Sequence, residues 1–155
     1  MHCLKPEEFE TSARVYNAKM YIQHCGSAEQ GEWRVHLMDA LLRDFLRRAD
    51  AAVAGNAVAA DLRFSHDVGM MPFFSLIGLG PYATRATFEE ASDVWNSSLY
   101  MCMATNLQMV FYRSRKGPVL VKFLLNEKET PVPALGEGPY YRWEDVRNYW
   151  IGILR

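Results

Sequence analysis

Residues 57–79 join two apolar segments through a pair of ionisable side chains. The first segment, AVAADLRF at 57–64, is typical of a short buried strand, and the second, MMPFFSLIGL at 70–79, is typical of a buried helix. Between them lie His66 and Asp67. Because buried ionisable groups need partners, the fold must give this junction either hydrogen-bonding neighbours or access to solvent and ligands.

Three other segments have the periodicity of amphipathic helices. Residues 6–25 place four apolar side chains at helical spacing, and Gly26 is a suitable stop. Residues 33–53 carry an apolar stripe on one face and a charged face opposite. A last helix is predicted at 142–154, with two acidic residues in its first turn, where the helix dipole favours them. The side chains expected to face inward on the first helix are Phe9, Ala13, Tyr16 and Met20.

Two β-rich runs predict a hairpin. NLQMVFYRS at 106–114 and VLVKFLLNE at 119–127 flank the turn RKGP. The segment at 80–95, GPYATRATFEEASDVW, precedes the hairpin and is expected to be an excursion on the surface. The order helix, helix, strand, helix, hairpin, helix predicts a mixed α/β fold.

Charge and composition limit the classes of function. Seventeen basic and eighteen acidic side chains among 155 residues give a net charge of −1, which argues against general binding to a nucleic-acid backbone. No apolar run approaches the roughly 18 residues of a membrane span, and the start MHCLKPEEFE lacks the features of a signal peptide. Cys3, Cys25 and Cys102 lack the spacing of zinc ligands, so we expect neither a metal nor a cofactor.

Spacing alone favours a structural role for the junction. Asp67 would cap the following helix, and His66 would be a buried histidine with satisfied hydrogen bonds. Pro72 leaves two starting points for that helix: it begins at Asp67 and tolerates the proline, or it begins at Pro72 itself. In both cases backbone N–H groups at the helix start point toward the pair, and such helix ends attract anions.

The segment DLRFSHDVGMMPFFSLIGL, residues 61–79, resembles the His-Asp segment of the histidine acid phosphatases. This branch of the histidine phosphatase superfamily includes the phytases, and the chain looks closest to bacterial members related to multiple inositol polyphosphate phosphatases. Residues 103–133 and 138–150 are similar to the C-terminal hairpin and final helix of those proteins.

The resemblance implies a fold and a division of the chain. It implies an α/β protein with part of a phosphoglycerate-mutase-like sheet, flanking helices and part of an α-helical cap. Residues 1–56 would be the helical segment that resembles part of the cap. Residues 57–155 would be the C-terminal part of the core, with the His-Asp motif, the hairpin and the final helix.

The resemblance also implies roles for the two residues at the junction. His66 would contact the phosphoryl group, and Asp67 would donate a proton to the leaving-group oxygen of a phosphate monoester, with inositol phosphates among the substrates. An aspartic acid has a reference pKa of about 3.9, so acidic conditions favour such a donor. The inositol polyphosphate phosphatases often carry His-Ala-Glu where this chain has His-Asp-Val, which leaves the subfamily and the regiochemistry open.

The nucleophile of these phosphatases is a histidine in the motif Arg-His-Gly-x-Arg-x-Pro, which this sequence lacks. The other histidines, His2, His24 and His36, lie in MHCL, IQHCG and RVHLM, and none matches. Since a general acid cannot replace the phosphohistidine step, we expect a C-terminal fragment that is inactive by itself. Its partner would be the missing N-terminal half, and the whole protein would be periplasmic or secreted, as family members usually are.

Two further expectations concern surfaces and side chains. A missing sheet neighbour should leave an exposed apolar edge, which favours homo-oligomers. A non-catalytic phosphate-binding or protein-interaction module is the alternative function. We interpret Arg63 as a structural ion-pair residue. The arginines expected on a solvated helix face are Arg34, Arg43, Arg47 and Arg48, and the side chains expected in the core are Met70, Met71, Phe73, Phe74, Met101, Met103 and Met109.

Overall fold

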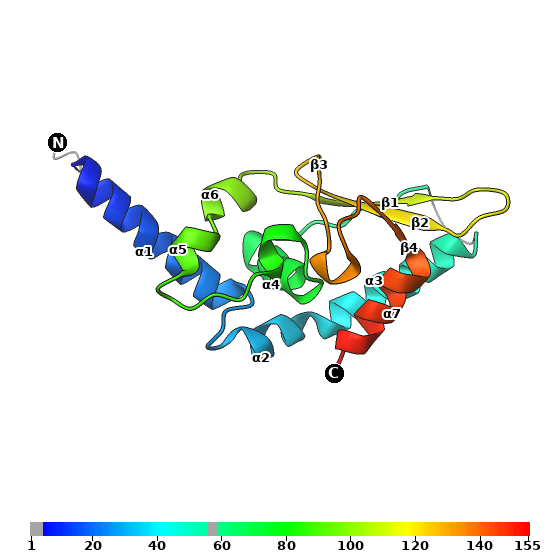
Figure 1. The fold of residues 1–155 in the computed structure, drawn as a ribbon, viewed down its shortest axis with the longest axis horizontal. Coiled ribbons are helices and arrows are strands. Elements are labelled where there is room, and N and C mark those ends of the chain that lie inside the picture. Colours follow the sequence, from blue (N-terminus) through cyan, green and yellow to red (C-terminus); the bar gives the residue numbers. More distant parts are fainter. Residues whose placement is uncertain (1–4, 56–58) are drawn as a thin grey trace.

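A computed structural model describes residues 5–55 and 59–155 as helices packed around one antiparallel sheet (Figure 1). Its α-helices are α1 (Pro6–His24), α2 (Gly31–Val35), α3 (Asp39–Val53), α4 (Asp67–Leu76), α5 (Ala91–Val94), α6 (Ser97–Tyr100) and α7 (Trp143–Ile153). Its strands are β1 (Leu107–Tyr112), β2 (Leu120–Leu125), β3 (Lys128–Glu129) and β4 (Tyr140–Arg142). Short 3₁₀ turns lie at η1 (His36–Met38), η2 (Gly80–Ala83) and η3 (Pro133–Leu135). The mixed α/β class predicted from the sequence is confirmed.

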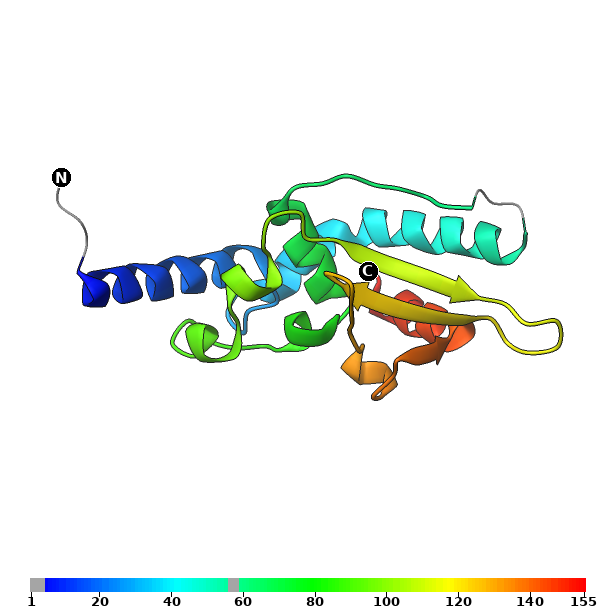
Figure 2. The same ribbon diagram turned by 90° about the horizontal axis from the view of Figure 1, so that it is seen from above.

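The first helix is confirmed, but its predicted inward face is only partly right. Pro6 is the first residue of α1, where a backbone N–H would have no acceptor within the helix, so proline loses no hydrogen bond there. The helix ends at His24, and the next residue, Cys25, has an extended conformation. Met20 is buried, whereas Phe9 is 66% exposed and Tyr16 is 55% exposed. The reason is visible in Figure 2, where the N-terminal half of α1 extends beyond the other elements.

The second predicted helix is divided by a 3₁₀ turn. The chain passes from α2 through η1 into α3, and the Nδ1 atom of His36 lies 2.9 Å from a carboxylate oxygen of Asp39 at the turn. α3 buries Leu42, Leu46 and Ala49, which all belong to the predicted apolar stripe. Arg43, Arg47 and Arg48 are exposed, as expected. Arg34 is not: it is partly buried and donates to the Ile22 carbonyl, so its predicted place on a solvated face is wrong.

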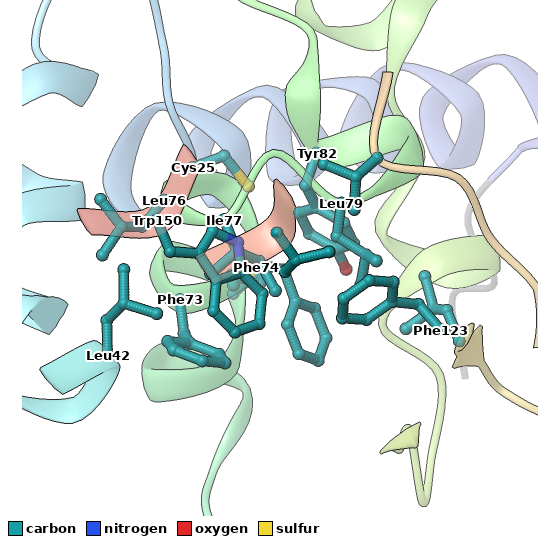
Figure 3. Close-up of a cluster of buried hydrophobic side chains, with 14 of the residues drawn as sticks. Cys25, Leu42, Phe73, Phe74, Leu76, Ile77, Leu79, Tyr82, Phe123 and Trp150 are labelled. Carbon is teal, nitrogen blue, oxygen red and sulfur yellow. The ribbon is translucent and has the colours of Figure 1, made fainter. Parts of the chain in front are cut away.

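The core forms around α4. Met71, Phe73 and Phe74 are buried there, as predicted, and Met70 is partly buried. Aromatic rings from other elements continue the cluster, with Tyr82 packed edge-on against Phe74 and Trp150 near Phe123 (Figure 3). Of the remaining methionines, Met101 and Met109 pack partly against this core, but Met103 is 95% exposed and its predicted burial is wrong.

The predicted hairpin is confirmed. β1 and β2 pair antiparallel with Leu107 opposite Leu125 and Tyr112 opposite Leu120, and β3 and β4 each pair with β2. Val121, Phe123 and Leu125 alternate toward the buried face. Among the described strands, β1 has a partner only on its β2 side.

Residues 80–95 lie at the surface, as predicted, but the segment is also anchored in the core. Tyr82, Ala86, Ala91 and Trp95 are buried. α1 holds this segment, because the Tyr21 hydroxyl donates to the Thr84 carbonyl and accepts from the Ala86 N–H. Hydrogen bonds to one tyrosine from distant residues leave no pattern in the local sequence.

The described part of the predicted strand at 57–64 does not pair as a strand. Residues 57 and 58 lie outside the described part, and residues 59–66 have no strand pairing. Leu62 is 78% exposed and Phe64 is 95% exposed. The composition of a strand is present, but a β-strand also needs a neighbouring backbone, and no described strand lies in hydrogen-bonding reach.

Asp50 connects α3 to α7. Asp50 on α3 accepts hydrogen bonds from Trp143 and Arg147, which fixes α7 against α3.

None of the helices within residues 5–55 and 59–155 combines the length and the apolar composition that a bilayer crossing requires.

Candidate functional site around His66 and Asp67

His66 and Asp67 lie where the extended segment turns into α4. His66 is the N-cap residue, with extended backbone angles of φ −104° and ψ 163°, and its carbonyl accepts from the N–H groups of Gly69 and Met70. Helix α4 begins at Asp67 and tolerates Pro72, so the first of the two predicted starting points is right. The site is therefore built at the N-terminus of α4.

Asp67 occupies the first position inside the helix and not the cap position. One of its carboxylate oxygens accepts the Val68 N–H at 2.8 Å, so the side chain still binds a backbone donor at the helix start. A negative charge at this end interacts favourably with the helix dipole. Asp67 thus binds a backbone N–H at the helix start, as expected of a capping side chain, although His66 and not Asp67 is the N-cap residue.

Both side chains are exposed to solvent. The structural interpretation of His66 as a buried histidine is wrong for this structure, since no described element covers it. Exposure leaves the imidazole and the carboxylate free to meet a ligand. Because the described elements do not enclose these side chains, a deep binding site at this position would need walls from another polypeptide segment.

A small hollow of about 150 Å³ adjoins Asp67. α1 contributes Tyr16 and Met20, one helical turn apart, and the α6 region contributes Ser97 and Ser98. Asp67 therefore faces a partly polar space that three segments distant in the sequence enclose, and Met101 completes its lining.

His24 is a neighbour that the sequence did not place at the site. Burial lowers the pKa of His24, the negative charge of Asp67 opposes that shift, and the charges of Arg34 and Lys19 add to it. His24 follows Met20 by one turn on α1. The spacing of Tyr16, Met20 and His24 indicates that they share one face of α1. It does not indicate that this face meets the start of α4, so the sequence alone could not place His24 at the site.

The neighbouring glycine and serine shape the approach to the site. A Cβ at Gly69 would lie 2.8 Å from the Ser65 hydroxyl oxygen, so the glycine lets the extended segment pass close to the first turn of α4. Ser65 itself donates weakly to the His66 carbonyl at 3.4 Å. It has no partner that would activate it as a nucleophile among the described residues.

Arg63 has the structural role that the sequence predicts. Its guanidinium donates to Asp44 at 2.5 Å and lies 3.7 Å from Asp61, and it stacks 4.3 Å from the centre of the Phe45 ring. These contacts direct Arg63 toward α3 and away from His66. A phosphate-binding role for this arginine is therefore not supported by its position.

A larger cavity of about 610 Å³ lies elsewhere, between α2, α4, η2, η3 and α7. Its polar lining includes Glu32, His36, Arg85 and Arg155, and neither residue of the His-Asp pair borders it. Hydrogen bonding to Arg155 lowers the pKa of Glu32. The charges of this cavity are thus partly neutralised within the chain.

No cluster of three or more His, Cys, Asp or Glu side chains suited to a metal occurs within residues 5–55 and 59–155. Cys25 is buried, and burial raises the pKa of its thiol to about 12, which makes it a poor nucleophile.

The chain matches no known protein family and no curated protein sequence.

Proposed function

We propose that this chain is a C-terminal part of a histidine acid phosphatase, a hydrolase of phosphate monoesters with inositol phosphates among its substrates. The observation that carries the proposal is the exposed His66–Asp67 pair at the start of α4. An imidazole, a carboxyl group and a helix N-terminus meet there without covering side chains. This combination suits a phosphate ester, whose negative charge the helix end and a protonated histidine both favour.

His66 acts as the phosphoryl contact in this proposal. In its protonated form the imidazole donates to a non-bridging oxygen and stabilises the charge spread over the phosphoryl group during transfer. Its position as the N-cap residue of α4 holds it beside the first N–H groups of the helix.

Asp67 acts as the general acid. Its carboxyl proton passes to the bridging oxygen as the P–O bond breaks, so that the leaving group departs as a neutral alcohol. The phosphorus at the same time bonds to a histidine nitrogen of the nucleophile motif, which another polypeptide segment must supply. Water then attacks the phosphohistidine and releases inorganic phosphate, with Asp67 accepting the proton of that water.

The hollow beside Asp67 is suited to the leaving alcohol. Tyr16, Ser97 and Ser98 bring hydroxyl-bearing side chains to it. A general acid must lie within hydrogen-bond reach of the departing oxygen, so the alcohol part of the ester belongs next to this carboxylate.

Binding of inorganic phosphate tests the site without requiring turnover. We expect phosphate-dependent NMR shifts at His66 and at the N–H groups of residues 67–70, and a loss of binding of about tenfold in His66→Ala. Lys116→Ala, on the exposed β1–β2 turn, is the matched control for loss of one cation. Equal affinity of the His66→Ala and parent proteins would contradict the proposed phosphoryl contact.

Turnover tests the assignment to an incomplete phosphatase. The purified chain should not hydrolyse p-nitrophenyl phosphate or phytate. Sequencing of the source DNA upstream of the Met1 codon should reveal an in-frame Arg-His-Gly-x-Arg-x-Pro motif. Hydrolysis by the chain alone that disappears in His66→Ala would overturn the proposed inactivity, and a stop codon and promoter directly upstream would overturn the fragment assignment.

A protein-interaction module is the second candidate function. The observation that favours it is the exposure of Leu62 and Phe64 on an unpaired extended segment. Such a module would use the apolar segment for its partner, and phosphate binding at His66 would then be dispensable.

A further inference from the structure

We infer that the large cavity between α2, α4, η2, η3 and α7 binds a small organic anion, in which one carboxylate or phosphate group is attached to an apolar body. The inference goes beyond the proposed function, because neither His66 nor Asp67 borders this cavity. It gives the chain a second ligand site, with its own chemistry.

The cavity has the size of a small-molecule site. Its volume is about 610 Å³, and ligand pockets in proteins usually enclose roughly 300–1,000 Å³. Segments far apart in the sequence form its walls, from the loop at Gly26 to the last turn of α7. A molecule with one or two rings fits such a space.

Part of the lining is apolar. Val35, Leu76 and Ile153 border the cavity with aliphatic side chains. Tyr82 borders it too, and its hydroxyl is already used, since it donates to the Tyr100 carbonyl at 3.0 Å. Contact with these groups removes apolar ligand surface from water, which favours binding. The body of the ligand is therefore apolar.

The carboxylates at the cavity are already paired within the chain. Glu32 accepts a hydrogen bond from the Arg155 side chain, which lowers the pKa of its carboxyl. Asp39 lies 2.9 Å from the Nδ1 atom of the cavity-lining His36 and accepts the Arg155 backbone N–H at 3.0 Å. Since their charges are compensated, these acids do not exclude an anionic ligand.

Arg85 is the cation that this pairing leaves over. Its side chain lines the cavity, and among the described residues no carboxylate forms an ion pair with it, whereas Arg155 is paired with Glu32. Its positive charge also lowers the pKa of the Glu32 carboxyl, so it acts on the polar part of the cavity. A ligand oxyanion supplies the missing partner, because a guanidinium donates two parallel hydrogen bonds to such a group.

The backbone on both sides of Arg85 is held in place. The Tyr21 hydroxyl donates to the Thr84 carbonyl at 2.6 Å and accepts the Ala86 N–H at 3.0 Å. The Ala86 carbonyl accepts the Ala28 N–H at 3.0 Å. A cation on an anchored backbone loses less conformational freedom on binding than one on a loose loop. Arg85 is therefore preorganised for a ligand.

Two further polar groups line the cavity. Because Asp39 holds the Nδ1 atom of His36, the Nε2 atom is the ring nitrogen left for a ligand, and it donates when the imidazole is protonated. Burial raises the pKa of the Tyr149 phenol, and no hydrogen bond to a described residue opposes that shift. The phenol is thus a neutral donor that still needs an acceptor.

Gly152 leaves room at the end of α7. It borders the cavity, yet a Cβ at this position would have no atom within 4 Å. Tyr149 lies three residues earlier, so the phenol and the gap share one face of the helix. The gap offers space for the apolar body beside the phenol, and a larger side chain at position 152 would occupy it.

The test measures binding of 3-phenylpropionate to the whole chain by NMR. We expect saturable amide shifts at residues 31–36, 85 and 149–154, with a Kd of about 1 mM. The uncharged 3-phenylpropionamide should bind about tenfold more weakly. Acetate, which lacks the apolar body, should give no saturable shift at these residues. Phenyl phosphate is compared with 3-phenylpropionate, and the tighter of the two identifies the anionic group of the ligand.

Two variants make the result specific. Arg85→Gln should weaken 3-phenylpropionate binding about tenfold and leave 3-phenylpropionamide binding unchanged. Arg113→Gln, on the exposed β1–β2 turn, is its control for the loss of one cation. Gly152→Leu should abolish binding of both compounds, and it should fold, because leucine favours a helix more than glycine does. Asn148→Leu, at an exposed position of α7 outside the cavity, is its control.

Several results would overturn the inference. Equal affinities for the acid and the amide, or for the parent and Arg85→Gln, would exclude an anion site at Arg85. Acetate that binds as tightly as 3-phenylpropionate would exclude the apolar subsite. A lack of saturable shifts at about 10 mM would exclude the cavity as a ligand site. Phosphate binding at His66 is read from the N–H groups of residues 67–70, so failure of the proposed function is distinguishable from failure of this inference.

Discussion

The guanidinium of Arg63 lies 4.3 Å from the centre of the Phe45 ring, which places a cation over an aromatic face at the boundary between the extended segment and α3. Phe45 in turn packs against Phe73 of α4, with ring centres 4.8 Å apart. The stack therefore connects the approach to the His-Asp junction with the core. It holds in place a segment with which none of the described strands pairs.

Replacement of Arg63 should loosen residues 60–65 without unfolding the protein. A cation–π contact at an exposed site is worth about 0.5–1 kcal/mol, which corresponds to a two- to fivefold change in a local opening equilibrium. In Arg63→Ala we expect NMR order parameters of this segment to fall toward the flexible range below about 0.6. Arg47→Ala is the control, because Arg47 binds the same Asp44 but does not contact the segment. Unchanged order parameters in Arg63→Ala would contradict this role.

The attachment of the segment to Asp44 should resist acid. Hydrogen bonds from Arg47 and Arg63 lower the pKa of the Asp44 carboxyl from 3.8 to about 2. A depressed carboxyl pKa stabilises the folded state above the ordinary value, and that contribution is lost as the pH falls through the folded-state value. The carboxyl-carbon chemical shift of Asp44 should thus stay constant from pH 7 to about pH 4 and change only near pH 2. A transition centred near pH 4 would show that the ion pairs do not form in solution.

Asn17 should be among the most sensitive polar residues of the chain. Its amide nitrogen donates to the Trp95 carbonyl at 2.7 Å, and its amide oxygen accepts from the Ser97 N–H at 2.7 Å. Since the side chain is buried, Asn17→Ala leaves two backbone groups without partners and should lower the free energy of unfolding by about 2–4 kcal/mol. Urea denaturation measures the loss. The exposed Asn148→Ala should change stability by less than about 0.5 kcal/mol, and equal losses in the two variants would contradict the argument.

The success of sequence reasoning differed between elements for physical reasons. α1, α4, α7 and the β1–β2 hairpin were predictable, because periodicity, caps and turn residues act locally. The junction at His66 and Asp67 was predictable as a helix start for the same reason. The strand at 57–64 was not, because its side chains specify a strand but its pairing depends on a backbone that no described strand provides.

The surroundings of the site could not be predicted from local patterns. Tyr16 and His24 come to Asp67 because α1 packs against the region that follows α4, and that packing depends on Asn17 and Tyr21 reaching residues about 65–80 positions away. Burial of Trp95 depends on the same contacts. Such long-range hydrogen bonds have no signature in a window of ten or twenty residues.

The buried thiol of Cys25 predicts a loss of stability in alkali. Burial raises its pKa from 9.0 to about 12, so between those values the unfolded chain loses a proton that the folded chain keeps. Unfolding is then favoured as the pH rises, by at most about 1.4 kcal/mol per pH unit. The free energy of unfolding should fall about 1 kcal/mol more between pH 9 and pH 10 in the parent protein than in Cys25→Ala. Tyr21 and Tyr82 also have pKa values raised by burial, and this contribution of burial is present in both proteins. An equal slope in Cys25→Ala and the parent would show that Cys25 ionises in the folded state as readily as in the unfolded chain.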